Sequence, residues 1–154
     1  MQLCNTTHYQ DYNLEDSLGY LANRAARSLV NRLNHNFAEA GHDVTAEQWG
    51  LLLELWHQDG QCQQHLANNA GKDKTSITRL IDGLEKRNLV VRIPCQIDRR
   101  HKLIYLTNRG KALQKELIPL VQKTLSEAQR DVAPKQMDNC KDVLQKIYRN
   151  LCNS

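Results

Sequence analysis

The sequence predicts a mainly helical protein with one small β-hairpin. Apolar stripes recur at steps of three and four residues near both ends of the 154-residue chain, as in amphipathic helices. Aromatic residues make up only 5%, with three prolines and seven glycines, which favours helices over a β-sandwich or barrel. Two short β-branched segments, LVVRI and LIYLT, flank a basic stretch and predict the hairpin.

The first helix is expected over residues 13–40. Asn13 can cap its start, and acidic residues fill the first turn, where they suit the helix dipole. An apolar stripe runs from Leu14 to Phe37, and Gly41 closes the helix. At 1.5 Å per residue this helix would be roughly 40 Å long. A small domain rarely needs a stripe of that length, so we expect part of it to pack on another chain.

Two shorter helices are expected to build the core. Thr45 and Gln48 match a capping box, in which each side chain bonds the other residue's amide. The segment behind them, WGLLLELW, is apolar nearly all round and should be central in the core. A second short helix is expected at about residues 62–69, and its inward residues would be Leu66, Ala67 and Ala70.

The helix over residues 73–87 combines a buried face with a basic one. Asp73 can cap it by accepting a hydrogen bond from the amide of Thr75 or Ser76. The buried face would consist of Ile77, Leu80, Ile81 and Leu84. The opposite face carries Thr75, Arg79, Asp82 and Lys86, with Lys74 and Thr78 at its flanks. Asn88 tolerates a left-handed backbone and can end the helix.

Strands at residues 89–93 and 103–107, joined by a basic loop, would form a wing. From Lys72 to Lys111 the chain holds eleven Lys or Arg against four Asp or Glu, whereas the net charge of the whole chain is only +4. The rest of the chain is therefore net acidic. A basic helix bearing hydroxyls beside a basic hairpin suits a grooved polyanion, and we expect sequence-specific binding to double-stranded DNA.

Long helices are also expected after the wing. Beyond Gly110, apolar residues predict a helix that is bent near Pro119, and Pro134 can open the last helix. The stripe of that last helix is Met137, Cys140, Leu144, Ile147 and Leu151. Apolar stripes at both ends predict an intertwined dimer interface built from residues 13–40 and 111–152. The alternative is a self-contained helical core.

Length and composition favour one soluble unit in a reducing compartment. The chain is expected to be one unit over residues 1–154, in which residues 1–12 form a loose arm. No run of residues is long and apolar enough to suggest a membrane span, and the N-terminus lacks the pattern of a secretory signal. Five cysteines without paired spacing favour free thiols in a reducing cytoplasm.

Two motifs make the chain resemble the MarR family of winged helix-turn-helix transcriptional regulators. The first is LA-x-x-AG-x-D-K-T-S-I-T-R-L-I-D-x-L-E at residues 66–85, and the second is D-x-R-x-x-x-I-x-L-T-x-x-G at residues 98–110. Asn88 departs from the family's usual glycine. The resemblance implies a winged helix-turn-helix region over residues 45–110 and a homodimer based on the terminal helices. It also implies binding to a pseudo-palindromic operator, most often as a repressor that an effector releases.

The residues of the 73–87 helix suggest distinct contacts with DNA. Its N-terminal half, with Thr75, Ser76, Thr78 and Arg79, is the part that reaches base edges in helix-turn-helix docking. Arg79 is the candidate for bidentate contact with guanine, and a solvated surface Arg is the alternative. Lys72 and Lys74 would contact phosphates and set the register, or would only solvate the surface.

In the wing, Arg100 matches the family's minor-groove arginine. Asp98 would hold Arg100 or another basic group of the wing by an ion pair, and a narrow minor groove attracts one inserted arginine. The alternative is a salt-bridged hairpin tip without a DNA role. The expected backbone partners are Arg99, His101 and Lys102.

The residues offer several candidates for the signal that such a regulator would sense. Cys62 and Cys95 lie nearest the DNA-reading parts and are candidate redox sites, while Cys4 among nearby tyrosines only loosely matches peroxide-sensing relatives. No spacing of His or Cys suggests a metal site. No cofactor is expected. The family's common effector is a small aromatic or phenolic molecule in the cleft between the dimer base and the winged domain. Trp49, Trp56 and residues of the first helix would line this cleft, and a plain core role for both Trp is the alternative.

Two other classes of protein compete with the DNA-binding reading. A winged-helix module for protein–protein contact would need a neutral or apolar face on the 73–87 helix. A thiol-based redox protein would need an activated cysteine, and only Cys95 is near enough to basic groups. No catalytic grouping or phosphate-binding glycine loop supports an enzyme.

Overall fold

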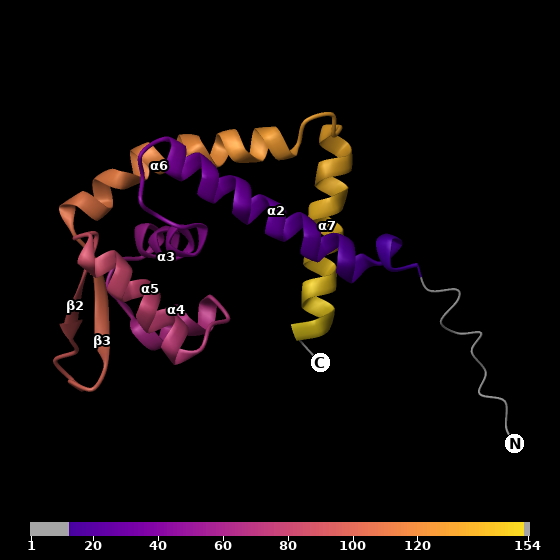
Figure 1. Ribbon diagram of the computed structural model, residues 1–154. Coiled ribbons are helices and arrows are strands. Elements are labelled where there is room, and N and C mark those ends of the chain that lie inside the picture. Colours follow the sequence, from indigo (N-terminus) through magenta and orange to yellow (C-terminus); the bar gives the residue numbers. More distant parts are fainter. Residues whose placement is uncertain (1–12, 153–154) are drawn as a thin grey trace, which may run out of the picture.

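The computed structural model describes residues 13–152 (Figure 1). It is mainly helical with one small sheet, which confirms the predicted fold class. The elements in chain order are η1 (Leu14–Asp16), α2 (Leu18–Glu39), α3 (Ala46–His57), β1 (Gln61–Cys62), α4 (Gln63–Asn69), α5 (Lys74–Lys86), β2 (Val90–Pro94), β3 (Lys102–Leu106), α6 (Asn108–Ala128) and α7 (Pro134–Cys152).

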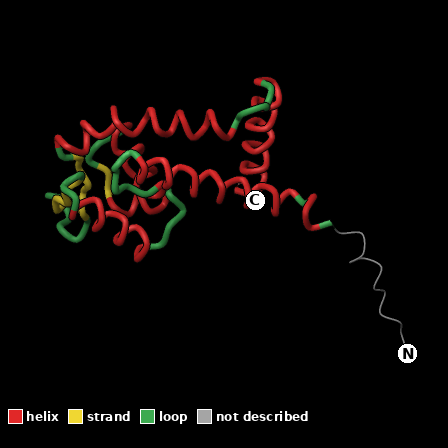
Figure 2. The backbone as a smooth tube through the Cα atoms, turned by 45° about the horizontal axis from the view of Figure 1, so that its top comes forward, coloured by secondary structure: helices red, strands yellow, loops and turns green. Residues whose placement is uncertain are grey.

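The molecule has a globular end and an extended end. Helices α3, α4 and α5 pack with the sheet at one end, while α2 and α6 run alongside each other away from it (Figures 1 and 2). Helix α7 crosses the far ends of α2 and α6. Among the described residues, no helix is both long enough and apolar enough to cross a bilayer.

The sheet is antiparallel, with β3 between β1 and β2. Val90 pairs with Leu106 and Arg92 with Ile104, which fixes the register of the wing. The first strand, β1, was not predicted, because two residues are too short to show an alternating pattern. Gln61 pairs with Ile104 and so attaches the start of α4 to the wing.

One hydrophobic core joins the globular end to the base of the extended helices. Phe37, Leu52, Leu84, Ile104 and Leu117 are fully buried and come from α2, α3, α5, β3 and α6. Burial of such side chains contributes about 1.5–3 kcal/mol each. A buried hydrogen bond, 2.8 Å from Asn36 Nδ2 to Thr124 Oγ1, links α2 to α6 farther out. Helix α5 and the wing are thus built on a well-packed support.

The predicted first helix is wrong at its start. Residues 14–16 form a single 3₁₀ turn, in which Asn13 caps as expected by accepting from the amide of Glu15 at 3.1 Å. Ser17 then adopts an extended backbone and caps α2 by accepting from the amide of Tyr20. Serine side chains compete in this way with helical hydrogen bonds, so the helix begins at Leu18.

Three smaller predictions are also corrected. Ala70 is exposed at the turn after α4, where Gly71 adopts a φ of +61°, rather than facing inward. Leu53 is 48% exposed, so α3 is not buried all round. Helix α6 begins before Gly110, at Asn108, because Thr107 caps it by accepting from the Gly110 amide at 3.0 Å.

Several predicted features are confirmed. The capping box at the start of α3 has both of its bonds, at 3.1 and 3.2 Å. Asn88 has a φ of +60° at the end of α5, as its left-handed tolerance suggested. Helix α6 contains Pro119 and is curved in Figure 1, and α7 begins at Pro134. The loose arm of residues 1–12, with Cys4, Tyr9 and Tyr12, lies outside the described residues.

Candidate nucleic-acid interface

The candidate interface is built on helix α5, whose first turn is capped as the sequence predicts. Asp73 Oδ1 accepts from the amide of Ser76 at 2.7 Å. Hydrogen bonds from the Ser76 amide and hydroxyl lower the pKa of the Asp73 carboxyl below its ordinary value of 3.8. The cap therefore stays charged at neutral pH, and it fixes the end of α5 that carries Lys74, Thr75 and Ser76.

The outer face of α5 carries both free and engaged groups. Thr75 and Arg79 are exposed, and within residues 13–152 the Arg79 guanidinium makes no hydrogen bond or ion pair. Thr78 differs, because its hydroxyl donates to the carbonyl of Lys74 at 2.7 Å and accepts from Gln63 Nε2 at 2.9 Å. The Arg79 donors are therefore available to a ligand, while the Thr78 hydroxyl is committed to the protein.

The two lysines before and at the start of α5 also differ. Lys72 Nζ lies 3.4 Å from a carboxylate oxygen of Glu47 in the first turn of α3, and its side chain is 26% exposed. Lys74 is exposed, and its ammonium group has no partner in the described part of the chain. A phosphate reaching Lys72 would have to share it with Glu47.

At the wing tip, Asp98 holds Arg100. The Arg100 guanidinium places Nε 3.0 Å from Oδ1 and Nη2 2.9 Å from Oδ2, and the Arg100 amide also donates to Oδ1 at 3.1 Å. These bonds lower the pKa of Asp98, and the pair raises the pKa of Arg100. The Arg100 side chain is still 90% exposed, so the pairing orients the guanidinium outward rather than burying it.

The other wing residues surround this pair. His101 Nε2 lies 3.6 Å from Asp98 Oδ2, and the His101 amide donates to the Asp98 carbonyl, closing the turn. Arg99 and Lys102 are exposed, and over residues 13–152 their side chains have no ion-pair partner. The wing therefore presents several cations on a hairpin whose tip is set by Asp98.

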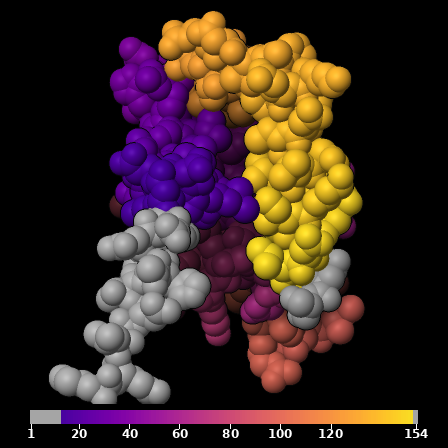
Figure 3. Space-filling model, turned by 90° about the vertical axis from the view of Figure 1, so that its right-hand side faces the viewer, coloured from indigo at the N-terminus to yellow at the C-terminus, as the bar shows by residue number. Residues whose placement is uncertain are grey.

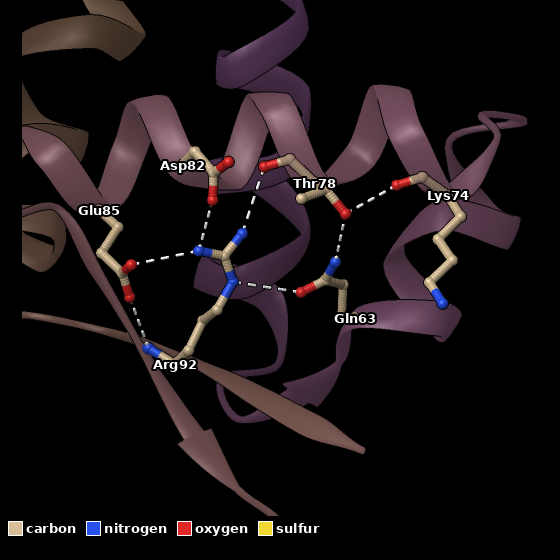
Figure 4. Close-up of polar contacts among 6 residues, drawn as sticks. All are labelled: Gln63, Lys74, Thr78, Asp82, Glu85 and Arg92. Carbon is tan, nitrogen blue, oxygen red and sulfur yellow. Dashed lines mark hydrogen bonds and ion pairs between the residues drawn. The ribbon is translucent and has the colours of Figure 1, made fainter. Parts of the chain in front are cut away.

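A network around Arg92 connects the wing to α5 and was missed by the sequence analysis (Figure 4). The Arg92 guanidinium lies 2.6 Å from Asp82 Oδ1 and 3.1 Å from Glu85 Oε1. It also donates to Gln63 Oε1 at 3.2 Å and to the Thr78 carbonyl at 3.2 Å. Only the charges of Asp82, Glu85 and Arg92 could have suggested it, because their proximity depends on how the strand crosses the helix.

The junction between α5, β2 and α6 is also tightly fixed. A Cβ added to Gly110 would collide with the carbonyl oxygen of Leu89, to which the Thr107 amide donates at 3.1 Å. The Thr107 hydroxyl donates to the Asn88 carbonyl at 2.6 Å, and Trp56 Nε1 donates to the Gly110 carbonyl at 2.9 Å. The C-terminal end of α5 is thereby attached to the start of α6.

The candidate sensing residues gain no clear site. Cys62 and Cys95 are half-buried free thiols, and Cys62 stands at the start of α4 without making a side-chain cap bond. Among residues 13–152, no three His, Cys, Asp or Glu side chains gather as a metal site would require. Trp49 and Trp56 pack edge to face, with ring centroids 5.4 Å apart, against the core.

Comparison with known proteins agrees with this architecture. Residues 44–102 match the model of the MarR family. A MarR-family transcriptional regulator from Rhodococcus sp. RHA1 is 27% identical, with a TM-score of 0.80 over 89% of this chain and 96% of that one. CouR from Rhodococcus jostii RHA1, solved with p-coumaroyl-CoA, is 26% identical, with a TM-score of 0.76 over 89% and 95%.

A third solved structure shows the same fold at lower identity. BpsR from Bordetella bronchiseptica, whose DNA binding is regulated by 6-hydroxynicotinic acid, is 23% identical, with a TM-score of 0.80. The match covers 89% of this chain and 96% of BpsR. The terminal helices of this chain, which lie outside the family model, are thus also part of the shared architecture.

Proposed function

We propose that this protein, a transcriptional regulator with the MarR-family domain and fold, binds double-stranded DNA as a homodimer. The observation that carries the proposal is the presence of two exposed cationic groups, Arg79 and Arg100, on α5 and on the wing, two elements that pack against each other. Arg79 lies on a helix of a size that fits the major groove, and Arg100 lies on a hairpin tip that fits the minor groove. A protein-interaction module would not need this cationic face.

Each element is proposed to have its own role. Arg79, with Thr75 and Ser76, would read base edges, whereas Lys74 would contact phosphate. Lys72, which is paired with Glu47, would add to the positive electrostatic potential of this surface. In the wing, Arg100 would enter the minor groove while Arg99, His101 and Lys102 contact the backbone. Residues 45–110 would thus form the DNA-binding region.

The dimer is proposed from the apolar surface of the extended end. Leu18 and Leu21 of α2 are 56% and 48% exposed, and Leu144 of α7 is 47% exposed. Among the described residues, α7 has no extensive contact with any other helix or strand. Figure 3 shows α2 and α7 on either side of a recess. A second copy, with the same apolar faces, would cover this surface through residues 13–40 and 111–152.

Repression released by a small aromatic effector is the proposed mode of regulation. CouR, at 26% identity, was solved with p-coumaroyl-CoA, whose acyl group is phenolic, which supports an effector with an aromatic or phenolic group for the present chain. Trp49 of α3 packs against Phe37 of α2, with ring centroids 6.3 Å apart, and Trp56 of α3 donates to the Gly110 carbonyl of α6. An aromatic ligand beside these two rings would therefore act on both the extended helices and the winged part. If the effector binds best when the two winged parts of the dimer have a spacing that does not match the two DNA half-sites, it would lower the affinity for DNA.

DNA selection from a random pool by the purified protein tests the proposal. The recovered sites should be pseudo-palindromes with half-sites about one helical turn apart, because a two-fold dimer presents two recognition helices. A single unpaired half-site would contradict the dimer. Failure to enrich any sequence over several rounds would contradict sequence-specific binding.

A further inference from the structure

We propose that Arg92 is a positioning residue, which holds the wing against the recognition helix without itself contacting DNA. The inference rests on the proposed DNA binding of the same surface. From its position alone, a basic residue on a wing strand would be taken for a phosphate contact. The geometry around its guanidinium points to a different role (Figure 4).

All three nitrogens of the guanidinium are engaged within the protein. Nε donates to Gln63, Nη1 lies between Asp82 and Glu85, and Nη2 donates to the backbone carbonyl of Thr78. The side chain is only 18% exposed. A phosphate would have to displace these partners and leave two carboxylates uncompensated, so the group is unsuited to binding DNA.

The contacts of Arg92 join three elements in one place. The residue stands on β2, Gln63 opens α4, and the other partners belong to α5. Glu85 receives both the side chain and the backbone amide of Arg92, each at 3.1 Å. The strand therefore cannot slide along the helix without losing charge-assisted bonds. The distance between the groove-facing groups of α5 and the wing is fixed by this attachment.

The same network limits which residues of α5 can read DNA. It neutralises Asp82, whose carboxylate would otherwise repel phosphates from the exposed face. Gln63, which bonds Arg92 through its oxygen, uses its amide nitrogen on the Thr78 hydroxyl. That hydroxyl already donates to Lys74, so its only proton is occupied. Base reading by α5 then falls to Thr75, Ser76 and Arg79.

The test compares Arg92→Met with a matched loss of charge, Lys115→Met, at an exposed position of α6 without an ion-pair partner in the described chain. Affinities are measured for the selected operator and for a scrambled duplex. Arg92→Met should lower the ratio of the two affinities by about tenfold or more, because hydrogen bonds to charged groups are lost, whereas Lys115→Met leaves it unchanged. If Arg92→Met instead binds both duplexes more weakly by the same factor, and its log affinity falls with log salt concentration with a slope smaller by about one, Arg92 contacts a phosphate and the proposal is overturned.

Amide hydrogen exchange, with no DNA present, tests the attachment separately. Arg92→Met should speed exchange of the amides in β2 and β3, while the amides of α3 keep their protection. Arg92→Lys should keep only part of the wing protection seen in the parent. Unchanged exchange in the wing would overturn the proposed attachment. If the parent binds no DNA, the proposed function fails, and faster wing exchange in Arg92→Met would still establish the structural link.

Discussion

The Arg100 guanidinium donates two hydrogen bonds to the Asp98 carboxylate, from Nε to Oδ1 at 3.0 Å and from Nη2 to Oδ2 at 2.9 Å. The pair lies at the wing tip, and the arginine remains 90% exposed while the aspartate is 32% exposed. A surface ion pair of this kind adds little to stability. Its effect is to restrict the directions in which the Arg100 side chain can point.

Replacing Arg100 with alanine should therefore affect DNA binding more than folding. We expect Arg100→Ala to lower operator affinity by roughly tenfold or more, because a narrow minor groove favours an inserted arginine. Thermal unfolding of the variant should match that of the parent. Asp98→Asn, which keeps the arginine but loses the charged partner, should have a smaller effect. A footprint for Arg100→Ala equal to that of the parent would refute the wing's role.

Arg79→Ala tests the reading face of α5. A bidentate contact with guanine discriminates by about 1–3 kcal/mol, so the variant should lose roughly 5- to 150-fold in affinity for its operator. The preference of the variant for one base at one position of each DNA half-site should also become weaker. Lys86→Ala, at the other end of the same exposed face, provides the comparison. Unaltered base preference in Arg79→Ala after a new selection would exclude a base contact.

The cap of α5 predicts a definite pH dependence. The pKa of Asp73 is lowered by its bonds to Ser76. A carboxyl group with a lowered folded-state pKa stabilises the fold fully above its ordinary value of 3.8, and this contribution disappears as pH falls through the folded-state pKa. An NMR titration should place the Asp73 midpoint below 3.8. Ser76→Pro, which removes the donating amide and hydroxyl, should raise the midpoint toward the ordinary value, and a parent midpoint above 3.8 would contradict the cap.

Gly110→Ala should disturb the junction below the recognition helix. Its new Cβ would meet the Leu89 carbonyl oxygen, which is backbone and cannot rotate away. Overpacking of this kind costs about 1–3 kcal/mol, measurable by chemical denaturation. Gly50→Ala in α3, where a Cβ has open space, is the matched control and should be neutral or slightly stabilising. Equal stability of the two variants would argue against the tight junction.

Leu144→Gln examines the proposed dimer. Since Leu144 is 47% exposed on the apolar side of α7, its replacement should weaken association and shift sedimentation toward the monomer at low concentration. Lys146→Gln, two residues along the same helix, removes only an exposed ion pair with Asp142 and should leave the dimer intact. A parent that sediments as a monomer would contradict the assignment.

Local signals in the sequence were sufficient to predict much of the fold. The capping pair Thr45 and Gln48, the cap at Asp73 and the left-handed Asn88 are each determined by neighbours within a few residues, and the structure contains all three. The apolar spacing of α5 identified its buried side because helical periodicity is local. The start of α2 was misplaced because the helix expected from Asn13 is interrupted at Ser17, which has an extended backbone and caps α2.

Features that depend on distant residues could not be predicted in this way. The pairing of Gln61 with Ile104 and the placement of Gly110 against Leu89 join segments far apart in the chain. The same holds for Arg92, whose partners come from α4 and α5. Sequence patterns therefore located the cationic groups of the candidate site, but not which of them are already engaged by the protein.

Salt-dependent binding to the selected operator and to a scrambled duplex tests the central claim most directly. The account predicts that affinity falls steeply and linearly with salt on logarithmic axes, because several phosphates are neutralised, and that the operator is preferred by about a thousandfold or more. Weak binding that is equal for both duplexes and insensitive to salt would contradict a DNA-reading role for Arg79 and Arg100.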